Sequence, residues 1–269
     1  HFLGIRSAQR AARCELSSID TAILLAGAIV AREYFNDPLI TEYVNQIYRR
    51  IDFPWMLNGG ETFVMGWVPE KGFLKERWWD YNEGVLLVLL ALGSPSRPAP
   101  PASWDALRRR EAVYKGKTLI QSSPLFTHQY PQFFFDLRDK HDRYADYFEN
   151  SKNATVCNYE YCMSEAAAYQ TYAKGYWGLT ACDSPFGYKA YGARPGSVLS
   201  DGTVAPTAAL GSMMFTPELS IAFLRKLYQN EKEWLWGKYG FCDAFNIDEE
   251  WNSLDVIGID QGAIILGIE

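Results

Sequence analysis

Apolar residues recur at helical spacing along most of the chain. The segment Ala22–Ala31 is apolar on nearly every side, and Ser17–Asp20 before it resembles a capping box. We therefore predict a helix over Thr21–Tyr34 that is buried all round. Pro38 opens a second predicted helix, through about Arg50, whose apolar residues lie on one face. An inner helix is thus followed by an outer one.

The same alternation recurs further along the chain. Asp80–Leu92 predicts another inner helix, and the charged segment Ala102–Tyr114 predicts an outer helix. Two such pairs suggest a double ring of helices, an all-α toroid, with long loops and short strands near Phe63–Val68. No fixed-period repeat or linker is present, so we expect a single domain over residues 1–269. Later predicted helices are Phe126–Arg138, Ala145–Met163, Pro206–Met214, Pro217–Asn230 and Gln261–Ile268.

The composition narrows the function classes. Hydrophobic residues make up 48% of the 269 residues and charged residues 22%, which argues against disorder. The formal charge of −6 disfavours nucleic acid as a partner, because binding to phosphates needs a basic surface. No apolar run is long enough to span a bilayer. Aromatic residues reach 15%, and several lie beside carboxylates, a mixture that suits sugar binding as well as an aromatic core.

The sequence offers no metal or cofactor motif. The five cysteines have no C-x-x-C spacing, and none of the three histidines stands at ligand spacing from another. No glycine-rich loop follows a predicted strand, so a nucleotide cofactor has no support either. We therefore expect neither a metal nor an organic cofactor.

Acidic residues stand where the apolar runs begin. If the helix starts at Asp80, the i and i+3 spacing places Asp80 and Glu83 on one face of its first turn. Both side chains would complement the positive helix N-terminus, an interpretation that suits Asp80 well. Glu83 directly precedes Gly84 and eight apolar residues, where burial should raise its pKa. A carboxyl group held partly neutral can act as a general acid.

Asp20 and Asp260 share this context at the start of other apolar helices. Capping of the first turn is the alternative role for Asp20. Inner helices that run the same way in a ring would bring these acids together at one end. Glu149 also suits a solvated helix face, and a structural role suits His128. Asp183 and Asp243, in aromatic loops, fit ligand binding and loop hydrogen bonding equally well.

A set of short motifs, in order from about residue 15 to the end, resembles the glycoamylase-like family of bacterial proteins. That family includes endo-β-1,2-glucanases and the C-terminal domain of cyclic β-1,2-glucan synthases. The matching segments are Glu15–Ala22, Asp52–Met56, Met65–Trp67, Pro69–Glu70, Gly72–Leu74, Asp80–Glu83, Leu92–Pro95, Pro124–Tyr130, Asp146–Ser151, Trp177–Asp183, Asp201–Thr203, Ala205–Ala208, Phe215–Glu218, Trp236–Phe241, Asp243–Asn246 and Gly258–Gly262.

The resemblance implies an (α/α)6 toroid, here without the family's N-terminal helices, that acts on β-linked glucose polymers without a cofactor. Residue by residue, it assigns Glu83 as proton donor, Asp260 as a candidate base and Asp20 as a further site acid. It also favours a periplasmic or secreted location and leaves the oligomeric state open. Substrate contacts are expected from Glu149, Asp80, Trp55, Trp67, Trp78, His128, Gln129, Trp177 and Asp183.

These expectations favour a glycoside hydrolase that cleaves β-glucan, with β-1,2-glucan preferred and inversion as the favoured outcome. Carboxyl groups about 6.5–9.5 Å apart would give inversion, and a separation of about 5–5.5 Å would give retention. Two alternatives remain open. One is the transglycosylase domain of a cyclic β-1,2-glucan synthase, and the other is a glycan-binding module without catalysis.

Overall fold

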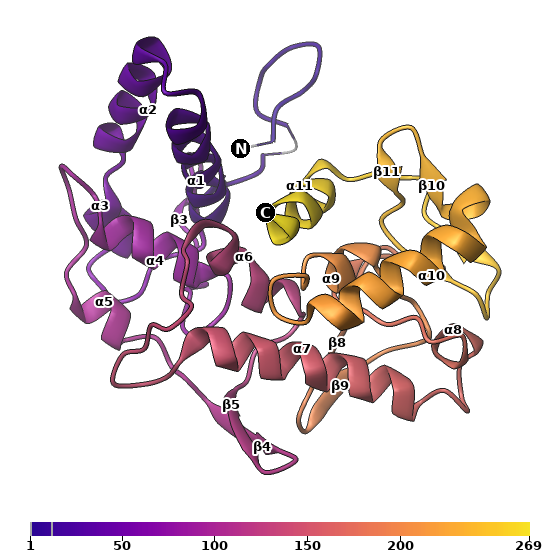
Figure 1. Ribbon diagram of the computed structural model, residues 1–269. Helices are drawn as coiled ribbons and strands as arrows, with labels where there is room; N and C mark the ends of the chain where they lie inside the picture. The colour runs from indigo at the N-terminus through magenta and orange to yellow at the C-terminus, as the bar shows by residue number, and fades with distance from the viewer. Residues whose placement is uncertain (1, 12) are drawn as a thin grey trace. The chain divides into compact units, whose positions relative to one another are not determined.

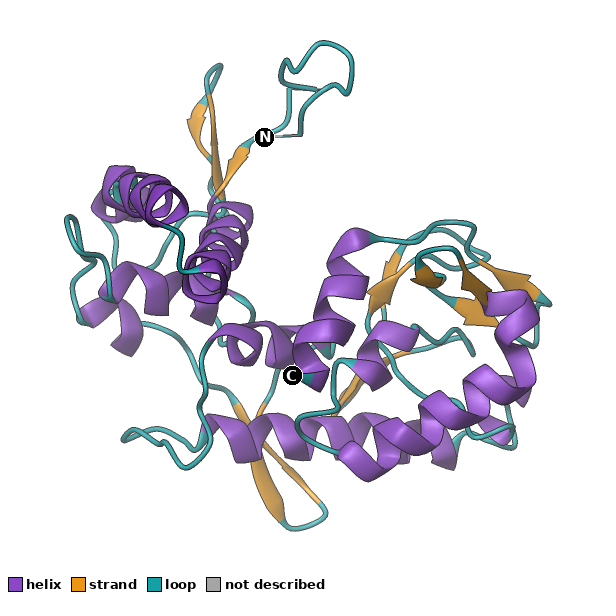
Figure 2. Ribbon diagram, turned by 45° about the horizontal axis from the view of Figure 1, so that its top comes forward, coloured by secondary structure: helices purple, strands orange, loops and turns teal. Residues whose placement is uncertain are grey.

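The computed structural model describes residues 2–11 and 13–269 (Figure 1). The chain forms two compact units, one extending to Arg109 and the other running from Arg110 to Glu269. Both are built mainly of helices with short antiparallel strands between them, as Figure 2 shows. Among the residues that the structure describes, none of the helices is long and apolar enough to cross a membrane.

In the first unit, two helices pack against helix α1. Helix α1 contacts both α2 and α4, and strands β1, β2 and β3 form one antiparallel sheet in that order. The elements are β1 (Leu16–Ser17), α1 (Ser18–Phe35), α2 (Pro38–Arg50), α3 (Phe53–Leu57), β2 (Gly66–Val68), β3 (Gly72–Phe73), α4 (Gly84–Leu92) and α5 (Ala102–Asp105).

The second unit joins longer helices through two-stranded hairpins. Helix α9 contacts α10 and α11, and α6 contacts α7 and α11. The helices are α6 (Phe126–Phe134), α7 (Tyr147–Ser164), α8 (Gln170–Ala173), α9 (Pro206–Leu210), α10 (Pro217–Leu235) and α11 (Gly258–Ile268). The paired strands are β4 (Glu111–Tyr114) with β5 (Lys117–Ile120), β6 (Ala181–Cys182) with β7 (Lys189–Ala190), β8 (Gly192–Arg194) with β9 (Ser197–Leu199), β10 (Trp236–Gly237) with β11 (Gly240–Phe241), and β12 (Phe245–Asn246) with β13 (Trp251–Asn252).

Local sequence signals account for the helix starts. The Ser17 hydroxyl accepts a hydrogen bond from the Asp20 N–H at 3.2 Å, so the predicted cap of α1 is confirmed. Asp37 accepts from the N–H groups of Leu39 and Ile40, and Pro38 occupies the first turn of α2, whose predicted bounds are also confirmed.

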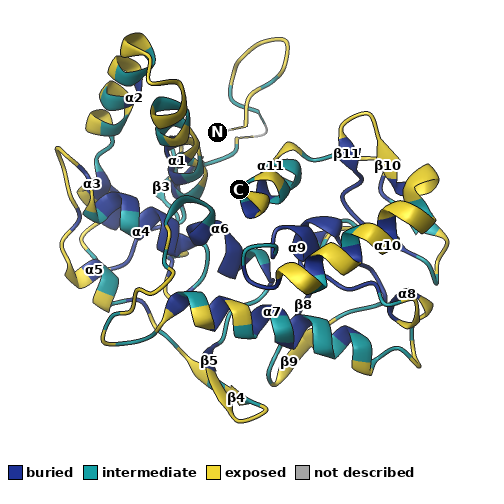
Figure 3. Ribbon diagram, viewed as in Figure 1, coloured by how far each residue is buried: buried dark blue, intermediate teal, exposed yellow. Residues whose placement is uncertain are grey.

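The two predicted inner helices of the first unit differ in burial. Helix α4 is buried along almost its whole length, as predicted, and is coloured accordingly in Figure 3. The prediction that α1 is buried all round is wrong. Ala22, Leu25 and Ala26 are buried, whereas Leu24 is 67% exposed and Val30 is 41% exposed. Helix α1 therefore uses one face against α2 and α4.

The predicted outer helix Ala102–Tyr114 is also wrong beyond its first turn. Helix α5 ends at Asp105, and Glu111–Tyr114 forms a hairpin with Lys117–Ile120 instead. The turn residues Lys115 and Gly116 both have positive φ, 48° and 79°. This backbone matches the strand-reversing turns of tight hairpins and cannot continue a helix.

The core of the second unit is aromatic. Trp177, Tyr172, Tyr176, Phe223 and Phe245 are buried, and several meet edge to face, with the ring centroids of Tyr176 and Phe245 5.5 Å apart. Gly178 has a φ of 125°, and a Cβ there would lie 3.0 Å from the Ala205 carbonyl oxygen. The Trp177 segment can therefore approach the start of α9 only with glycine at this position.

The burial of α4 predicts a large difference between two leucine variants. Leu86 is fully buried, so Leu86→Ala should lose about 2–5 kcal/mol of unfolding free energy. Leu24→Ala removes the same atoms from an exposed position and should change it by less than about 0.5 kcal/mol. Urea unfolding followed by circular dichroism measures both, and equal midpoints would contradict the packing described here.

Candidate active site

Glu83 occupies the N-cap position of the buried helix α4 but does not cap it. Its side chain makes no capping hydrogen bond, and Asn82 Oδ1 instead accepts from the Gly84 N–H at 2.9 Å. Burial beside the apolar helix raises the pKa of Glu83 to about 7. A substantial fraction of this carboxyl group therefore carries a proton at neutral pH.

Asp80 behaves differently from Glu83. Because α4 starts only at Gly84, the expectation that both acids share the first helical turn is wrong. Asp80 lies instead in a bridge beside Arg108, whose Nη2 donates to Asp80 Oδ2 at 2.9 Å. Asp80 is therefore paired with a cation, whereas Glu83 is not paired with any cation that the structure describes.

Trp78 connects the first turn of α1 to the segment that precedes α4. Its indole N–H donates to the Ser18 hydroxyl at 3.0 Å, and that hydroxyl donates to the Val64 carbonyl oxygen at 2.7 Å. The first turn of α1, which carries the exposed Asp20, is thereby tied to the segment that leads to Glu83. Trp78 is only 7% exposed, which gives it a positioning role in this structure, and its predicted sugar contact stays a prediction.

In the second unit, Asp260 belongs to a buried pair of carboxyl groups. It lies in the first turn of α11, and its electrostatic neighbour is Asp243, which is 2% exposed. Burial and the neighbouring Asp243 charge raise the pKa of Asp260, and burial also raises that of Asp243.

The loop residues around this pair are acidic as well. Asp183 donates its backbone N–H to Asp243 Oδ2 at 2.7 Å. Burial raises the pKa of the Cys182 thiol, and the charges of Asp243, Asp260, Asp201 and Asp183 raise it further, so all four aspartates lie near Cys182. Asp201 is set apart by its partners: Tyr191, Lys189 at 3.2 Å and the Thr203 N–H at 3.1 Å. Burial opposes ionisation of Asp201, but these hydrogen bonds outweigh it and lower its pKa.

Asp243 is the acidic residue whose importance the sequence did not settle. Its position in an aromatic loop fitted ligand binding and loop hydrogen bonding equally. The structure shows that it accepts from the Asp183 backbone N–H, and burial raises its pKa. The only sequence signal was a lone acid among apolar neighbours, since no spacing rule pairs residues 243 and 260.

The remaining predicted contacts fall into exposed and buried groups. Trp55 is 41% exposed and packs with Trp67 and Phe73 at ring-centroid distances of 5.9 and 4.6 Å. Glu149 is exposed and pairs with Lys152 at 3.4 Å. Trp177, by contrast, lies 1% exposed in the aromatic core. The exposed residues are accessible to a ligand, whereas Trp177 contributes to packing in this structure.

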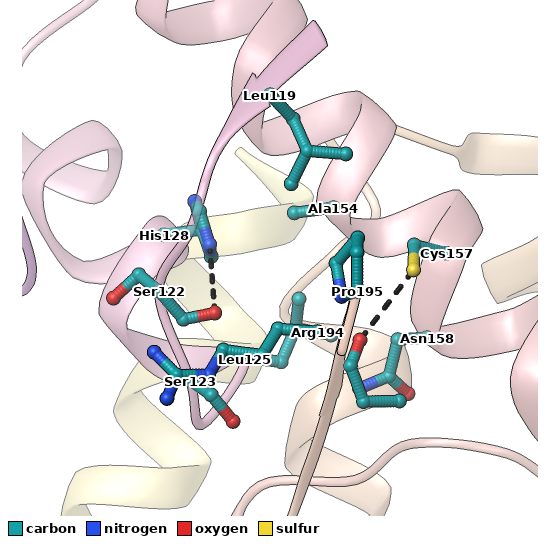
Figure 4. A pocket seen from close by; sticks show the side chains of 11 residues that line it. Leu119, Ser122, Ser123, Leu125, His128, Ala154, Cys157, Asn158, Arg194 and Pro195 are labelled. Atoms are coloured by element: carbon teal, nitrogen blue, oxygen red, sulfur yellow. Dashed lines mark hydrogen bonds between the residues drawn. The ribbon is translucent and has the colours of Figure 1, made fainter. Parts of the chain in front are cut away.

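His128 and Gln129 on α6 are also buried. Gln129 Nε2 donates to the Ala208 carbonyl and the Ser212 hydroxyl, both at 2.8 Å. Burial lowers the pKa of His128 to about 4, so the ring is neutral, with Nε2 3.3 Å from the Ser122 carbonyl oxygen (Figure 4). The cavity beside it measures about 10 Å³, room for no more than one water molecule. Both side chains contribute to the packing of α6 against neighbouring segments. Their predicted contact with substrate stays a prediction.

Among residues 2–11 and 13–269, no group of three or more His, Cys, Asp or Glu side chains is arranged to hold a metal ion. The acids with raised pKa values are Glu83 in one unit and Asp243 and Asp260 in the other. Such groups can donate or accept a proton near neutral pH.

Comparison with known proteins shows that this chain is similar to carbohydrate-active enzymes. The chain is 27% identical to an exo β-1,2-glucooligosaccharide sophorohydrolase (non-reducing end) of Parabacteroides distasonis, covering 93% of this chain and 39% of that protein. An endo-β-1,2-glucanase from Chitinophaga pinensis, solved with sophorotriose and glucose, matches with a TM-score of 0.87 and 29% identity. That match covers 94% of this chain and 65% of the other.

A β-1,2-glucanase structure from Parabacteroides distasonis gives a TM-score of 0.87 at 26% identity, over 94% of this chain and 41% of that one. The chain thus spans between about two fifths and two thirds of the length of these relatives. The family model Glycoamylase, described as "Putative glucoamylase", matches residues 75–269, which include Glu83, Asp243 and Asp260. The resemblance expected from the sequence is thereby confirmed: the chain belongs to the glycoamylase family.

Proposed function

We propose that this chain hydrolyses β-1,2-linked glucans. The observation that carries the proposal is Glu83, a carboxyl group whose pKa burial raises to about 7 at the start of a buried helix. The relatives support the substrate, since their names specify β-1,2-glucans or β-1,2-glucooligosaccharides. We further propose that both units belong to one catalytic domain with an (α/α)6 toroid fold and a periplasmic or secreted location.

The reaction needs one proton donor and one base. In the proposed mechanism the Glu83 carboxyl protonates the glycosidic oxygen as the bond between that oxygen and the anomeric carbon breaks. A water molecule attacks the anomeric carbon and transfers its proton to the Asp243–Asp260 pair. This pair can accept the proton while one of its two carboxyl groups is ionised, and the raised pKa values make the ionised group a stronger base. Asp20 is a further site acid, and inversion is the favoured stereochemical outcome.

Removal of the proposed acid should abolish turnover without abolishing binding. Glu83→Gln keeps the shape of the side chain but cannot donate a proton, so kcat on linear β-1,2-glucan should fall by about 10²–10⁴-fold. Glu33→Gln, at an exposed position on α1, is the control and should keep its activity. Release of reducing ends measures turnover, and affinity electrophoresis in glucan measures binding.

The same assay separates hydrolysis from the alternatives. New reducing ends indicate hydrolysis, whereas redistributed or cyclised chains would indicate transglycosylation. Binding without any product would identify a glycan-binding module. Normal turnover by Glu83→Gln would remove Glu83 from the mechanism.

The pKa of Glu83 predicts the alkaline side of the pH profile. The protonated form is active, so kcat/KM on a short β-1,2-glucooligosaccharide should fall as the pH rises through about 7. The loss should approach tenfold per pH unit above that point. Constant activity to pH 9 would contradict a proton donor with this pKa.

The raised pKa of Asp260 predicts how the stability of the fold depends on pH. The pKa of Asp260 is raised above its ordinary value of 3.8 in the folded protein. The free energy of unfolding should therefore fall progressively as the pH rises above 3.8. Asp260→Asn cannot ionise. It should therefore raise the melting temperature at pH 8, by roughly 3 °C for each kcal/mol relieved, and by less at pH 5.

Asp248→Asn is the matched control. Asp248 accepts hydrogen bonds from the backbone of Gln170 and Thr171, and these interactions outweigh burial and lower its pKa. Its charged form therefore stabilises the fold at neutral pH, and Asp248→Asn should lower the melting temperature. Differential scanning calorimetry measures both variants, and a fall for Asp260→Asn at pH 8 would contradict the buried-pair description.

A further inference from the structure

The first unit contains a pocket that involves none of the acids discussed above. Its volume is about 480 Å³, within the roughly 300–1,000 Å³ typical of small-molecule sites. The walls combine one aromatic ring with hydrogen-bond donors and hydrogen-bond acceptors. The side chains that carry the argument are Asn58, Glu61, Thr62, Arg77, Trp79 and Arg108.

Trp79 presents an accessible ring on a fixed backbone. Its side chain is 47% exposed, although it lines the pocket. The Trp79 carbonyl accepts from the Arg108 N–H at 2.8 Å, and the Tyr81 N–H donates to the Arg108 carbonyl at 2.9 Å. The guanidinium groups of Arg108 and Arg77 lie 5.7 and 6.0 Å from the ring centroid. The backbone and the two arginines thus hold the ring in place while half of it remains open to a ligand.

Arg77 supplies donors beside that ring. Its guanidinium donates to the carbonyl oxygens of Leu57, Thr62 and Asn58, and it makes no ion pair within the described part of the chain. These bonds use three of its five N–H groups. Gly60 makes the arrangement possible, because a Cβ there would lie 2.7 Å from Arg77 Nη1. Two N–H groups of Arg77, which lines the pocket, make no hydrogen bond among the described residues.

The other walls add acceptors and an unsatisfied hydroxyl. Glu61 is exposed and provides a carboxylate. Thr62 is 4% exposed, and its hydroxyl has no hydrogen-bond partner among the residues that the structure describes. A flat ring flanked by N–H donors and a carboxylate matches a pyranose, whose C–H face is apolar and whose edge carries hydroxyl groups that both donate and accept.

We propose that this pocket binds a glucosyl unit of the glucan chain, away from the bond that is cleaved, by stacking on Trp79 and hydrogen bonding to Arg77 and Glu61. The proposal rests on the proposed function and extends it, since it makes the enzyme favour long chains over short ones. Nothing in the sequence pattern singled out Trp79, which follows Trp78 directly and differs from it in being exposed.

The test compares Trp79→Ala with Trp236→Ala on two substrates. Trp236 is the matched control because it is 48% exposed and lies in the other unit. For Trp79→Ala, KM on long linear β-1,2-glucan should rise about tenfold, which corresponds to about 1.4 kcal/mol of lost binding, while kcat stays unchanged. Both kinetic constants on sophorotriose should stay at the wild-type values, and Trp236→Ala should match the wild type on both substrates.

A second variant keeps the proposal testable if Trp79→Ala fails to fold. Glu61→Ala leaves the ring in place and should raise KM on the long glucan in the same direction, with a melting temperature close to that of the wild type. Wild-type KM on long glucan for folded Trp79→Ala and Glu61→Ala would overturn the proposal. So would quenching of tryptophan fluorescence by inorganic phosphate but not by β-1,2-glucan, if it is present in the wild type and absent in Trp79→Ala, because it would identify an anion site. Absence of any turnover by the wild type would instead refute the proposed function.

Discussion

A carboxyl group at the start of an apolar helix loses its contact with water without gaining a cationic partner, and this constraint sets the pKa of Glu83. At Glu83 the helix is capped by Asn82, so the acid is left beside buried aliphatic side chains and its pKa rises to about 7. At Asp260 the neighbour is another acid, Asp243, and burial together with the Asp243 charge raises the pKa of Asp260. Asp80 shows the contrast, because Arg108 provides the charge that Glu83 lacks.

The packing of the helices produces the burial that raises these pKa values. Burial of α4 on nearly all sides gives Glu83 its apolar surroundings, and the hydrogen bond from Trp78 to Ser18 fixes the segment before it against the first turn of α1. In the second unit, the aromatic core around Trp177 supports the loops that carry Asp183 and Asp243. Packing and chemistry are therefore linked, since the interactions that exclude water from the core also set the protonation of the acids.

Local signals in the sequence were sufficient for much of the helical structure. Asp37 and Pro38 predicted the start of α2, and the apolar run before Leu92 predicted the burial of α4. The hairpin at Lys115–Gly116 was missed because lysine gives no sign of the positive φ that the turn imposes on it. Long-range contacts were out of reach: the Asp243–Asp260 pair joins residues on different elements, and the adjacent Trp78 and Trp79 differ in burial only through the fold.

Direct titration of Glu83 tests the central claim most clearly. Carbon-13 NMR of protein labelled at the glutamate carboxyl carbon, compared with the Glu83→Gln variant, assigns the Glu83 signal and follows it with pH. We expect a midpoint near pH 7, because the carboxyl group is buried without a cationic partner. A midpoint near the ordinary value of 4.5 would show that the group is solvated or paired, and the proposed role of Glu83 as proton donor would fail.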